Sequence, residues 1–321
     1  MAPAASGPSQ RLAAAAQALA VDAVSGEVLG ALGAAGIDVL LLKGPTFARL
    51  LYDSGGERSY SDTDLLLHER DVPRAESVIA ELGFRLVLSG ELFAEWQRHA
   101  RTWQRPADAQ MVDVHWTLPG LGVEPERAWA VLARDRVALA VGGAQTAALA
   151  PPAAALHVGL HAAQHGTSAA KGIRDLERAL ERLPTETWRG AAGLARELNA
   201  EAAFGAGLRL APAGRALAGE LTLGERISPA LLLQAGAAPG AAMGFEHLAA
   251  TRGTRARARL VARTLVPPAD HLRFYKPLAR RGRSGLAAAY LVRPLDLARQ
   301  APGALRAWRA ARREARLHNN G

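Results

Sequence analysis

The chain begins with short apolar runs that alternate with amphipathic segments and are separated by glycine and proline. Short apolar runs bounded by turn residues are typical of buried strands, whereas apolar residues three and four positions apart indicate helices. These patterns predict a helix, a strand, a short helix, a second strand, a helix and then further strands. The predicted helices cover 10–35, 46–52 and 71–82, and the predicted strands cover 37–42, 64–68, a stretch that begins at 84, 111–116 and 136–141.

The pattern changes at Pro151-Pro152, after which helical spacing predominates. We expect helices over 153–165, 173–183 and 188–200, followed by further helices that end at prolines. The sequence therefore predicts an α+β fold, in which a small mixed β-sheet with flanking helices precedes a mostly helical C-terminal part. We place the three units at 1–150, 151–250 and 251–321.

Charge and cysteine content narrow the classes of protein. The 321 residues include no cysteine, which excludes disulfides and cysteine-ligated zinc and is compatible with a reducing cytoplasm, where we expect the protein. The formal net charge is +9, but residues 1–150 hold 13 basic and 18 acidic side chains. Residues 251–321 hold 17 basic and 3 acidic ones, so the basic excess belongs to a C-terminal tail.

Two aspartates stand two residues apart at the start of a predicted strand. Asp62 and Asp64 should point to the same side of that strand, with their Cβ atoms about 6–7 Å apart. Two carboxylates this close repel each other, and a divalent cation with oxygen ligands is a natural partner for them. Isolated pairs of this kind are also common in solvated turns, so the pair alone is a weak signal.

Two further features favour a functional interpretation of this pair. Upstream, Lys43-Gly44 stands between a predicted strand and a helix, where glycine permits close backbone approach and a helix N-terminus attracts phosphate. Downstream, Asp113 lies between Val112 and Val114, and a carboxylate inside an apolar strand is unfavourable unless it binds something. Three carboxylates on neighbouring strands beside a glycine-containing turn match the two-metal arrangement of phosphoryl and nucleotidyl transfer.

Four blocks that together span roughly residues 35–200 resemble a little-characterised bacterial nucleotidyltransferase family of the DNA polymerase β superfamily. Their order and spacing agree with that family, although Lys43-Gly44 stands where the superfamily usually has Gly-Ser or Gly-Gly. The blocks are Leu40-Leu41-Leu42-Lys43-Gly44, Arg58-Ser59-Tyr60-Ser61-Asp62-Thr63-Asp64-Leu65-Leu66-Leu67, Val112-Asp113-Val114-His115-Trp116, and Leu160-His161-Ala162-Ala163-Gln164-His165-Gly166 with Ile173-Arg174-Asp175-Leu176.

The resemblance implies a polymerase β-like nucleotidyltransferase core in 1–150, including the N-terminal helix, and a helical domain in 151–250. It implies a catalytic site in which Mg²⁺, with Mn²⁺ as a substitute, is held by Asp62, Asp64 and Asp113. The implied substrate is a nucleoside triphosphate, and an NMP is transferred to an unknown small-molecule, peptide or nucleic-acid acceptor. The residues implied to bind nucleotide and phosphate are Lys43, Gly44, Arg58 and Ser61.

Several residues near these motifs have two interpretations each. Arg58 could bind phosphate or acceptor, or it could pair with an aspartate and orient it. His115 shares the strand face of Asp113 and could contact substrate or simply be packed. His161 and His165 lie on one helix face, so they could contact substrate or form a hydrogen-bonded cluster with Asp175; a zinc site there is disfavoured because the ligands of one straight helix converge poorly.

The basic segment 252–316 leaves other functions open. Its arginines could bind nucleic acid, another polyanion or an anionic membrane surface, or they could form a solvated helical face. The sequence therefore leaves two alternatives to an enzyme. One is a catalytically inactive, nucleotide-binding module with the same fold, and the other is a basic-tailed adaptor in which the aspartate pair is incidental.

Overall fold

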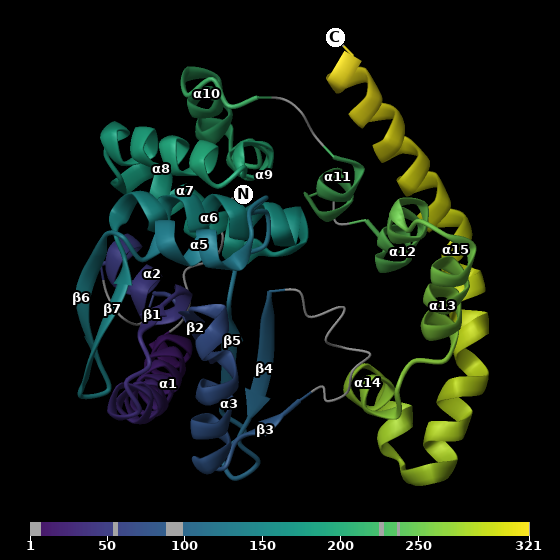
Figure 1. The fold of residues 1–321 in the computed structure, drawn as a ribbon, viewed down its shortest axis with the longest axis horizontal. Helices are drawn as coiled ribbons and strands as arrows, with labels where there is room; N and C mark the ends of the chain where they lie inside the picture. The colour runs from purple at the N-terminus through teal and green to yellow at the C-terminus, as the bar shows by residue number, and fades with distance from the viewer. Residues whose placement is uncertain (1–7, 54–56, 88–98, 225–227, 236–237, 321) are drawn as a thin grey trace.

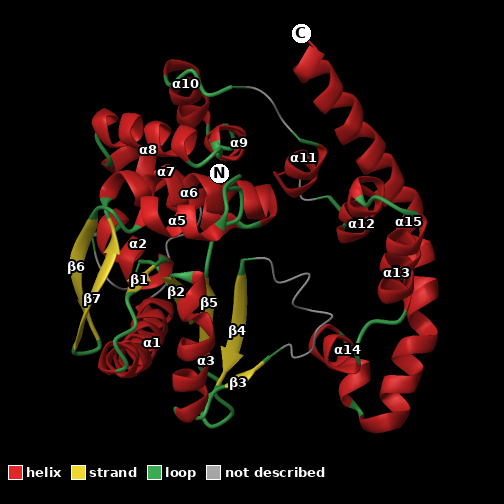
Figure 2. Cartoon of the chain, in the orientation of Figure 1, coloured by secondary structure: helices red, strands yellow, loops and turns green. Residues whose placement is uncertain are grey.

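The computed structural model describes residues 8–53, 57–87, 99–224, 228–235 and 238–320. All its strands precede residue 150, and the described residues after that point form helices (Figures 1 and 2). The strands are β1 (Val39–Leu41), β2 (Asp62–Leu67), β3 (Arg85–Leu86), β4 (Ala100–Gln104), β5 (Met111–His115), β6 (Arg136–Val141) and β7 (Ala144–Leu149). The helices among them are α1 (Pro8–Ala34), α2 (Lys43–Leu51), α3 (Val72–Glu81) and α5 (Pro125–Leu132).

The strands form one mixed sheet of seven strands in the order β3-β4-β5-β2-β1-β7-β6. β2 runs parallel to β5 and antiparallel to β1, while β1 runs parallel to β7. The strand that begins with the aspartate pair is therefore central, and it is hydrogen-bonded along both of its edges.

Each face of the sheet packs against a different set of helices. Leu41, Leu65 and Leu67 point to the face that α1 and α3 cover, and they are fully buried there with Val28 and Ile79. Leu40, Leu42 and Leu66 point to the opposite face, where the helices that follow residue 150 complete a second core. Because successive side chains of β1 and β2 point to opposite faces, the sheet has one apolar core on each face. The second core joins the sheet to the helical part.

Helix α1 is the one described helix whose length and apolar composition, over Leu12–Ala34, would suffice to cross a membrane. In the structure it packs along the sheet, and Val28 and Leu32 are fully buried. Gly26 and Gly142 touch through their backbones, because a Cβ atom on Gly26 would lie 2.2 Å from the Gly142 carbonyl oxygen. This contact fixes α1 against the turn between β6 and β7.

The helical part forms two groups. Helices α6 to α10 pack on one another, with α6 in contact with β7, and α11 leads to a second group around the long helix α15 (Figure 1). The first group is α6 (Pro151–His165), α7 (Ala170–Arg182), α8 (Thr185–Glu197), α9 (Glu201–Leu208) and α10 (Pro212–Glu220). The second is α11 (Pro229–Ala235), α12 (Gly240–Ala250), α13 (Thr254–Leu265), α14 (Ala269–Tyr275) and α15 (Gly282–Asn320).

The predicted α+β fold with a mixed sheet and a mostly helical C-terminal part is confirmed. Three elements were not predicted, namely β4, β7 and α5. The sequence of β4, Ala-Arg-Thr-Trp-Gln, lacks apolar alternation because the strand is only half-buried, so its pairing with β5 defines it. β7 follows β6 after a two-glycine turn at Gly142-Gly143, and both glycines have positive φ angles that a two-residue hairpin turn requires.

Candidate active site

The site begins with the alternation of side chains along β2. The Thr63 hydroxyl points toward α1 and shares a 2.7 Å hydrogen bond with Ser25. Asp62 and Asp64, one position to either side, point to the other face, toward the helical part. Asp64 is buried, whereas Asp62 at the strand's first position is half-buried.

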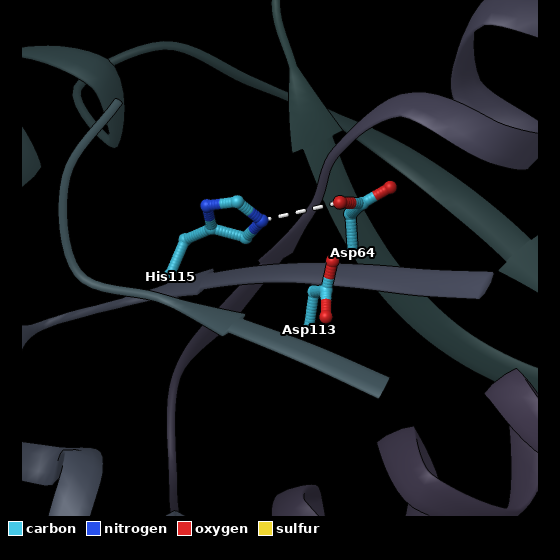
Figure 3. Close-up of side chains that lie close together, drawn as sticks. All are labelled: Asp64, Asp113 and His115. Atoms are coloured by element: carbon cyan, nitrogen blue, oxygen red, sulfur yellow. Dashed lines mark hydrogen bonds and ion pairs between the residues drawn. The ribbon is translucent and has the colours of Figure 1, made fainter. Parts of the chain in front are cut away.

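Strand β5 adds two polar side chains next to Asp64. The parallel register pairs Asp64 with Asp113 and Leu66 with His115. Figure 3 shows the three side chains of Asp64, Asp113 and His115 together, and one potential ligand atom from each lies within 4.8 Å of the others. Asp62 lines the same cavity beside this cluster without belonging to it.

Asp64 is the electrostatic centre of this cluster. Its Oδ1 atom lies 2.7 Å from Nζ of Lys43 and 3.1 Å from Nε2 of His115. Burial by itself would raise the pKa of Asp64, but the charge of Lys43 and the hydrogen bond from His115 outweigh burial and hold that pKa well below its usual range. The same carboxylate raises the pKa of Lys43 against the effect of burial, so both groups are charged.

At Asp62 and Asp113, no nearby positive charge outweighs the effect of burial on the pKa. Burial, and then the charge of Asp64, raise the pKa values of both Asp62 and Asp113. The Oδ1 atom of Asp113 is buried and has no hydrogen-bond partner among the described residues. Lys43 contacts only Asp64 directly, and the charge of Lys171 has a smaller effect on Asp62, so three carboxylates remain that fit a divalent metal with oxygen ligands.

Gly44 forms a sharp turn between β1 and the regular part of α2. Its φ of +44° and ψ of −117° are not helical, and a side chain there would be strained at that φ. The amide of Leu42 donates to the Asp64 carbonyl at 2.9 Å, so the turn is bonded to the strand that carries the carboxylates. Lys43, Gly44 and the first residues of α2 are thereby held at the edge of the cavity.

Arg58 links the Gly44 turn to helix α7 and forms a buried ion pair there. Its Nε and Nη2 atoms donate to the two carboxylate oxygens of Asp175 on α7, at 2.8 Å each, and Nη1 donates to the Gly44 carbonyl at 3.1 Å. Tyr52 also donates to Asp175, at 2.7 Å. Of the two interpretations of Arg58, pairing with an aspartate is the observed one, and the partner is Asp175 from the helical part.

The predicted hydrogen-bonded cluster of His161, His165 and Asp175 needs correction at Asp175, because Arg58 and Tyr52 engage both of its oxygens. The rings of His161 and His165 do meet, with centroids 4.6 Å apart. Both histidines line the cavity, opposite the aspartates. Burial lowers the pKa values of both histidines, so their imidazoles are neutral near pH 7.

The cavity has a volume of about 450 Å³ and lies between the sheet and α6–α7. Nearly all of the predicted site residues border it, and the exception is Ser61, which is exposed beside β2. Five polar residues of the cavity were not predicted as site residues, namely Tyr60, His99, Thr102, Gln164 and Lys171. Lys171 had a usable signal, because the chain has only three lysines and the other cavity lysine, Lys43, drew attention on that ground.

His157 lies beneath the cavity and should make stability depend on pH. It is buried against Phe47, its Nδ1 atom has no described partner, and burial followed by the charge of Lys43 lowers its pKa to about 3. The unfolded imidazole takes up a proton below its ordinary pKa, near 6.5, whereas the folded one does not. Stability should therefore fall by about 2 kcal/mol between pH 7.5 and pH 5 through this group alone.

Urea denaturation of the wild type and of His157→Leu at both pH values isolates this contribution. His161 also has a lowered pKa and titrates in both proteins, so the difference between the two pH dependences reports His157 alone. Equal pH dependence in the two proteins would contradict the assignment. The charged groups that act on His157 are Lys43, Asp64, His115 and Arg58, and all of them are present in both proteins.

Comparison with known proteins bears directly on this site. A family model described as uncharacterised nucleotidyltransferase matches residues 8–213, which contain the whole sheet, the cavity and α6–α9. The chain belongs to this nucleotidyltransferase family. The match ends at the start of α10, and the group around α15 lies outside it. No curated protein sequence matches the chain significantly.

Solved structures match about half of this chain. The antibiotic-resistance factor ANT(2'')-Ia matches with 14% identity and a TM-score of 0.37, over 54% of this chain and 90% of its own. An antigenic nucleotidyltransferase-like protein from Paracoccidioides brasiliensis matches with 18% identity and a TM-score of 0.36, over 57% of this chain and 91% of its own.

Proposed function

We propose that this member of the family is an active, Mg²⁺-dependent nucleotidyltransferase that transfers an NMP from an NTP to an acceptor and releases pyrophosphate. The observation that carries the proposal is the cluster of Asp64, Asp113 and His115 in a cavity that also holds Asp62, Lys43 and the Gly44 turn. A buried carboxylate with an unsatisfied oxygen beside a second carboxylate is unfavourable unless it binds a cation, which supports a metal site here.

Each part of the cavity has a role in this proposal. Asp62, Asp64 and Asp113 would hold Mg²⁺, or Mn²⁺ in its place, and the metal would neutralise the charge that develops on the transferred phosphoryl group. Lys43 and the N-terminal end of α2 beyond Gly44 would bind the triphosphate. In the transfer an acceptor oxygen bonds to the α-phosphorus, the bond to the pyrophosphate oxygen breaks, and the acceptor loses a proton.

His99, His161 and His165 border the space that an acceptor would occupy. Burial, together with the charges of His115 and Lys43, lowers the pKa of His99 to about 4. These neutral imidazoles would therefore serve as hydrogen-bonding groups for the acceptor or the base. We further propose a cytoplasmic location, which the absence of cysteine supports.

The proposal is tested by nucleotide binding and by turnover, measured separately. Binding is followed as the rise in melting temperature with each NTP in the presence of Mg²⁺, and turnover is followed as pyrophosphate release with hydroxyl-bearing acceptors. We expect both signals for the wild type and for Asp38→Ala, which removes an exposed carboxylate that pairs with Arg136 outside the cavity. Asp62→Ala should lose turnover.

The outcomes distinguish the candidate functions. Pyrophosphate release that Asp62→Ala abolishes supports the enzyme. Binding of NTP without any release would identify the chain as a nucleotide-binding module. The absence of both signals would leave the adaptor as the better explanation of this fold.

A further inference from the structure

The outer face of α15 carries a continuous stripe of exposed residues whose character changes along the helix. The positions are three and four residues apart, so they lie on one side of the helix. The opposite side is buried at Gly285, Ala289, Ala304, Ala311 and Ala315. The exposed stripe, which we call the α15 stripe, is Leu291, Leu295, Ala298 and Pro302 followed by Arg306, Arg309, Arg313 and Arg316.

The apolar half of the α15 stripe is unusually open to solvent. Leu291 is 77% exposed and Leu295 is 57% exposed. Leucine side chains at this exposure gain little free energy from folding, because burial against apolar surface is what stabilises them. Four residues in the same stripe then carry a positive charge each, so the stripe is amphipathic along its length.

Helix α13 lies beside α15 and repeats this combination. Figure 1 shows both helices on the side of the molecule opposite β6 and β7, and Arg293 of α15 donates to the Thr264 carbonyl at 2.7 Å. No described side chain of α13 is buried. Its arginines at 255, 257 and 259 are exposed, and Val261 and Leu265 are 43% and 39% exposed.

The positive charge of this region is not compensated within the region. Residues 251–321 hold three acidic residues against 17 basic ones: Asp270 pairs with Arg273, Asp296 pairs with Lys276, and Glu314 also has a partner. Among the described ion pairs, none includes an arginine of the α15 stripe or Arg255, Arg257 or Arg259 of α13. The charge therefore faces solvent and is free to attract an anionic surface.

Between these helices lies an apolar groove of about 600 Å³. Met243, Phe245 and Leu248 of α12 form one wall, and Leu260 and Leu265 of α13 form another. Pro294 and Leu297 of α15 close the groove, next to the apolar half of the stripe. A groove of this kind can bind an apolar group, such as an acyl chain, while the arginines around it contact anionic groups of the same surface.

We propose that α13 and the α15 stripe dock on an anionic membrane surface. Each arginine close to such a surface contributes about 1 kcal/mol, and exposed leucines add the free energy of transfer into the acyl boundary. Arginine suits this position because its stem lies along apolar groups while the guanidinium reaches the phosphates. The region lies beyond the segment that the family model matches, so docking would be a property added to the nucleotidyltransferase part.

The exposed leucines are what favour a membrane over a nucleic acid. A phosphate backbone attracts arginines, but it offers no apolar partner to Leu291, Leu295 and Val266, and Val266 is 67% exposed. Bases could stack on aromatic side chains, yet the α15 stripe contains none. A bilayer supplies phosphates and apolar groups at one surface, in the arrangement that the two halves of the stripe present.

Co-sedimentation of the full chain with vesicles tests the proposal. We expect binding to phosphatidylcholine vesicles that contain 30% phosphatidylserine, and at least ten-fold weaker binding to phosphatidylcholine alone. Leu291→Ser with Leu295→Ser should weaken binding about ten-fold. Arg306→Gln with Arg309→Gln and Arg313→Gln should weaken it further and reduce its salt dependence. Circular dichroism checks that each variant remains folded.

Matched substitutions elsewhere serve as controls. Leu12 and Leu19 of α1 are 74% and 71% exposed, so Leu12→Ser with Leu19→Ser should leave vesicle binding unchanged. Failure of the wild type to bind the anionic vesicles overturns the proposal. So does binding that survives in the leucine variant and is competed equally by single-stranded RNA, which would identify a general polyanion site. Loss in the control variant would instead place the membrane contact on α1.

Discussion

Asp113→Asn is expected to lower nucleotidyl transfer by about 10³-fold while leaving the protein as stable as the wild type or more so. The loss corresponds to about 4 kcal/mol of transition-state stabilisation, the scale seen when one charged member of a catalytic unit is removed. Stability should not fall, because the carboxylate is buried, its Oδ1 atom lacks a described partner, and burial and Asp64 raise its pKa. Asparagine keeps the shape and removes the desolvated charge.

Asp64→Asn is the matched comparison, because it should lower both the rate of nucleotidyl transfer and the free energy of unfolding. It removes the carboxylate that lies 2.7 Å from Nζ of Lys43 and 3.1 Å from Nε2 of His115. The ammonium group is then left largely buried without its partner, at a cost of about 3 kcal/mol or more in the free energy of unfolding. Urea denaturation and pyrophosphate release, measured on both variants, check the pair of predictions. An Asp113→Asn protein that retains transfer would remove this residue from the chemistry.

Arg58→Met is expected to lower the free energy of unfolding by about 3–5 kcal/mol, the usual effect of breaking a buried ion pair from one side. Arg58 is 3% exposed and Asp175 is 1% exposed, so the carboxylate cannot recover water when its partner is removed. The Gly44 carbonyl loses its donor in the same variant, and affinity for NTP should fall with stability. Arg58→Lys should rescue little, because a single ammonium cannot replace the bidentate fork.

The double variant Arg58→Met with Asp175→Leu separates the two effects. Removal of both charges should restore most of the lost stability, since no unpaired buried charge remains. Affinity for NTP should stay low, because the Gly44 turn still lacks its support. Denaturation and NTP titration on the single and double variants supply both readouts. Recovery of NTP affinity in the double variant would show that Arg58 supports the fold and has no influence on the turn.

Much of the site could be predicted because its chemistry is local in sequence. The i, i+2 spacing of Asp62 and Asp64 on one strand face is enforced by strand geometry, and Thr63 accordingly points to α1. An isolated aspartate between two valines indicates a strand with one functional face, and the register of β2 with β5 places Asp113 opposite Asp64. Lys43 and Gly44 lie at the edge of the cavity, where strand, glycine and helix follow one another directly in the sequence.

The remaining parts depend on contacts between distant segments. Asp175 lies more than a hundred residues from Arg58, and nothing local to α7 distinguishes its buried carboxylate from the exposed charges around it. His99 borders the cavity only because β4 pairs with β5, and β4 is defined by that pairing rather than by an apolar pattern of its own. The positions of Asp175 and His99 depend on contacts between segments that are distant in the chain, and a single sequence does not reveal such contacts.

The position of β2 in the sheet has a consequence for how this protein moves. As the fourth of seven strands it is hydrogen-bonded to β1 and β5, so the amide protons of Thr63 to Leu66 can exchange with solvent only when the whole core unfolds. Helix α13 has no buried side chain and can fray by itself. The carboxylates of Asp62, Asp64 and Asp113 thus stand on central strands, in the part of the chain that we expect to exchange most slowly.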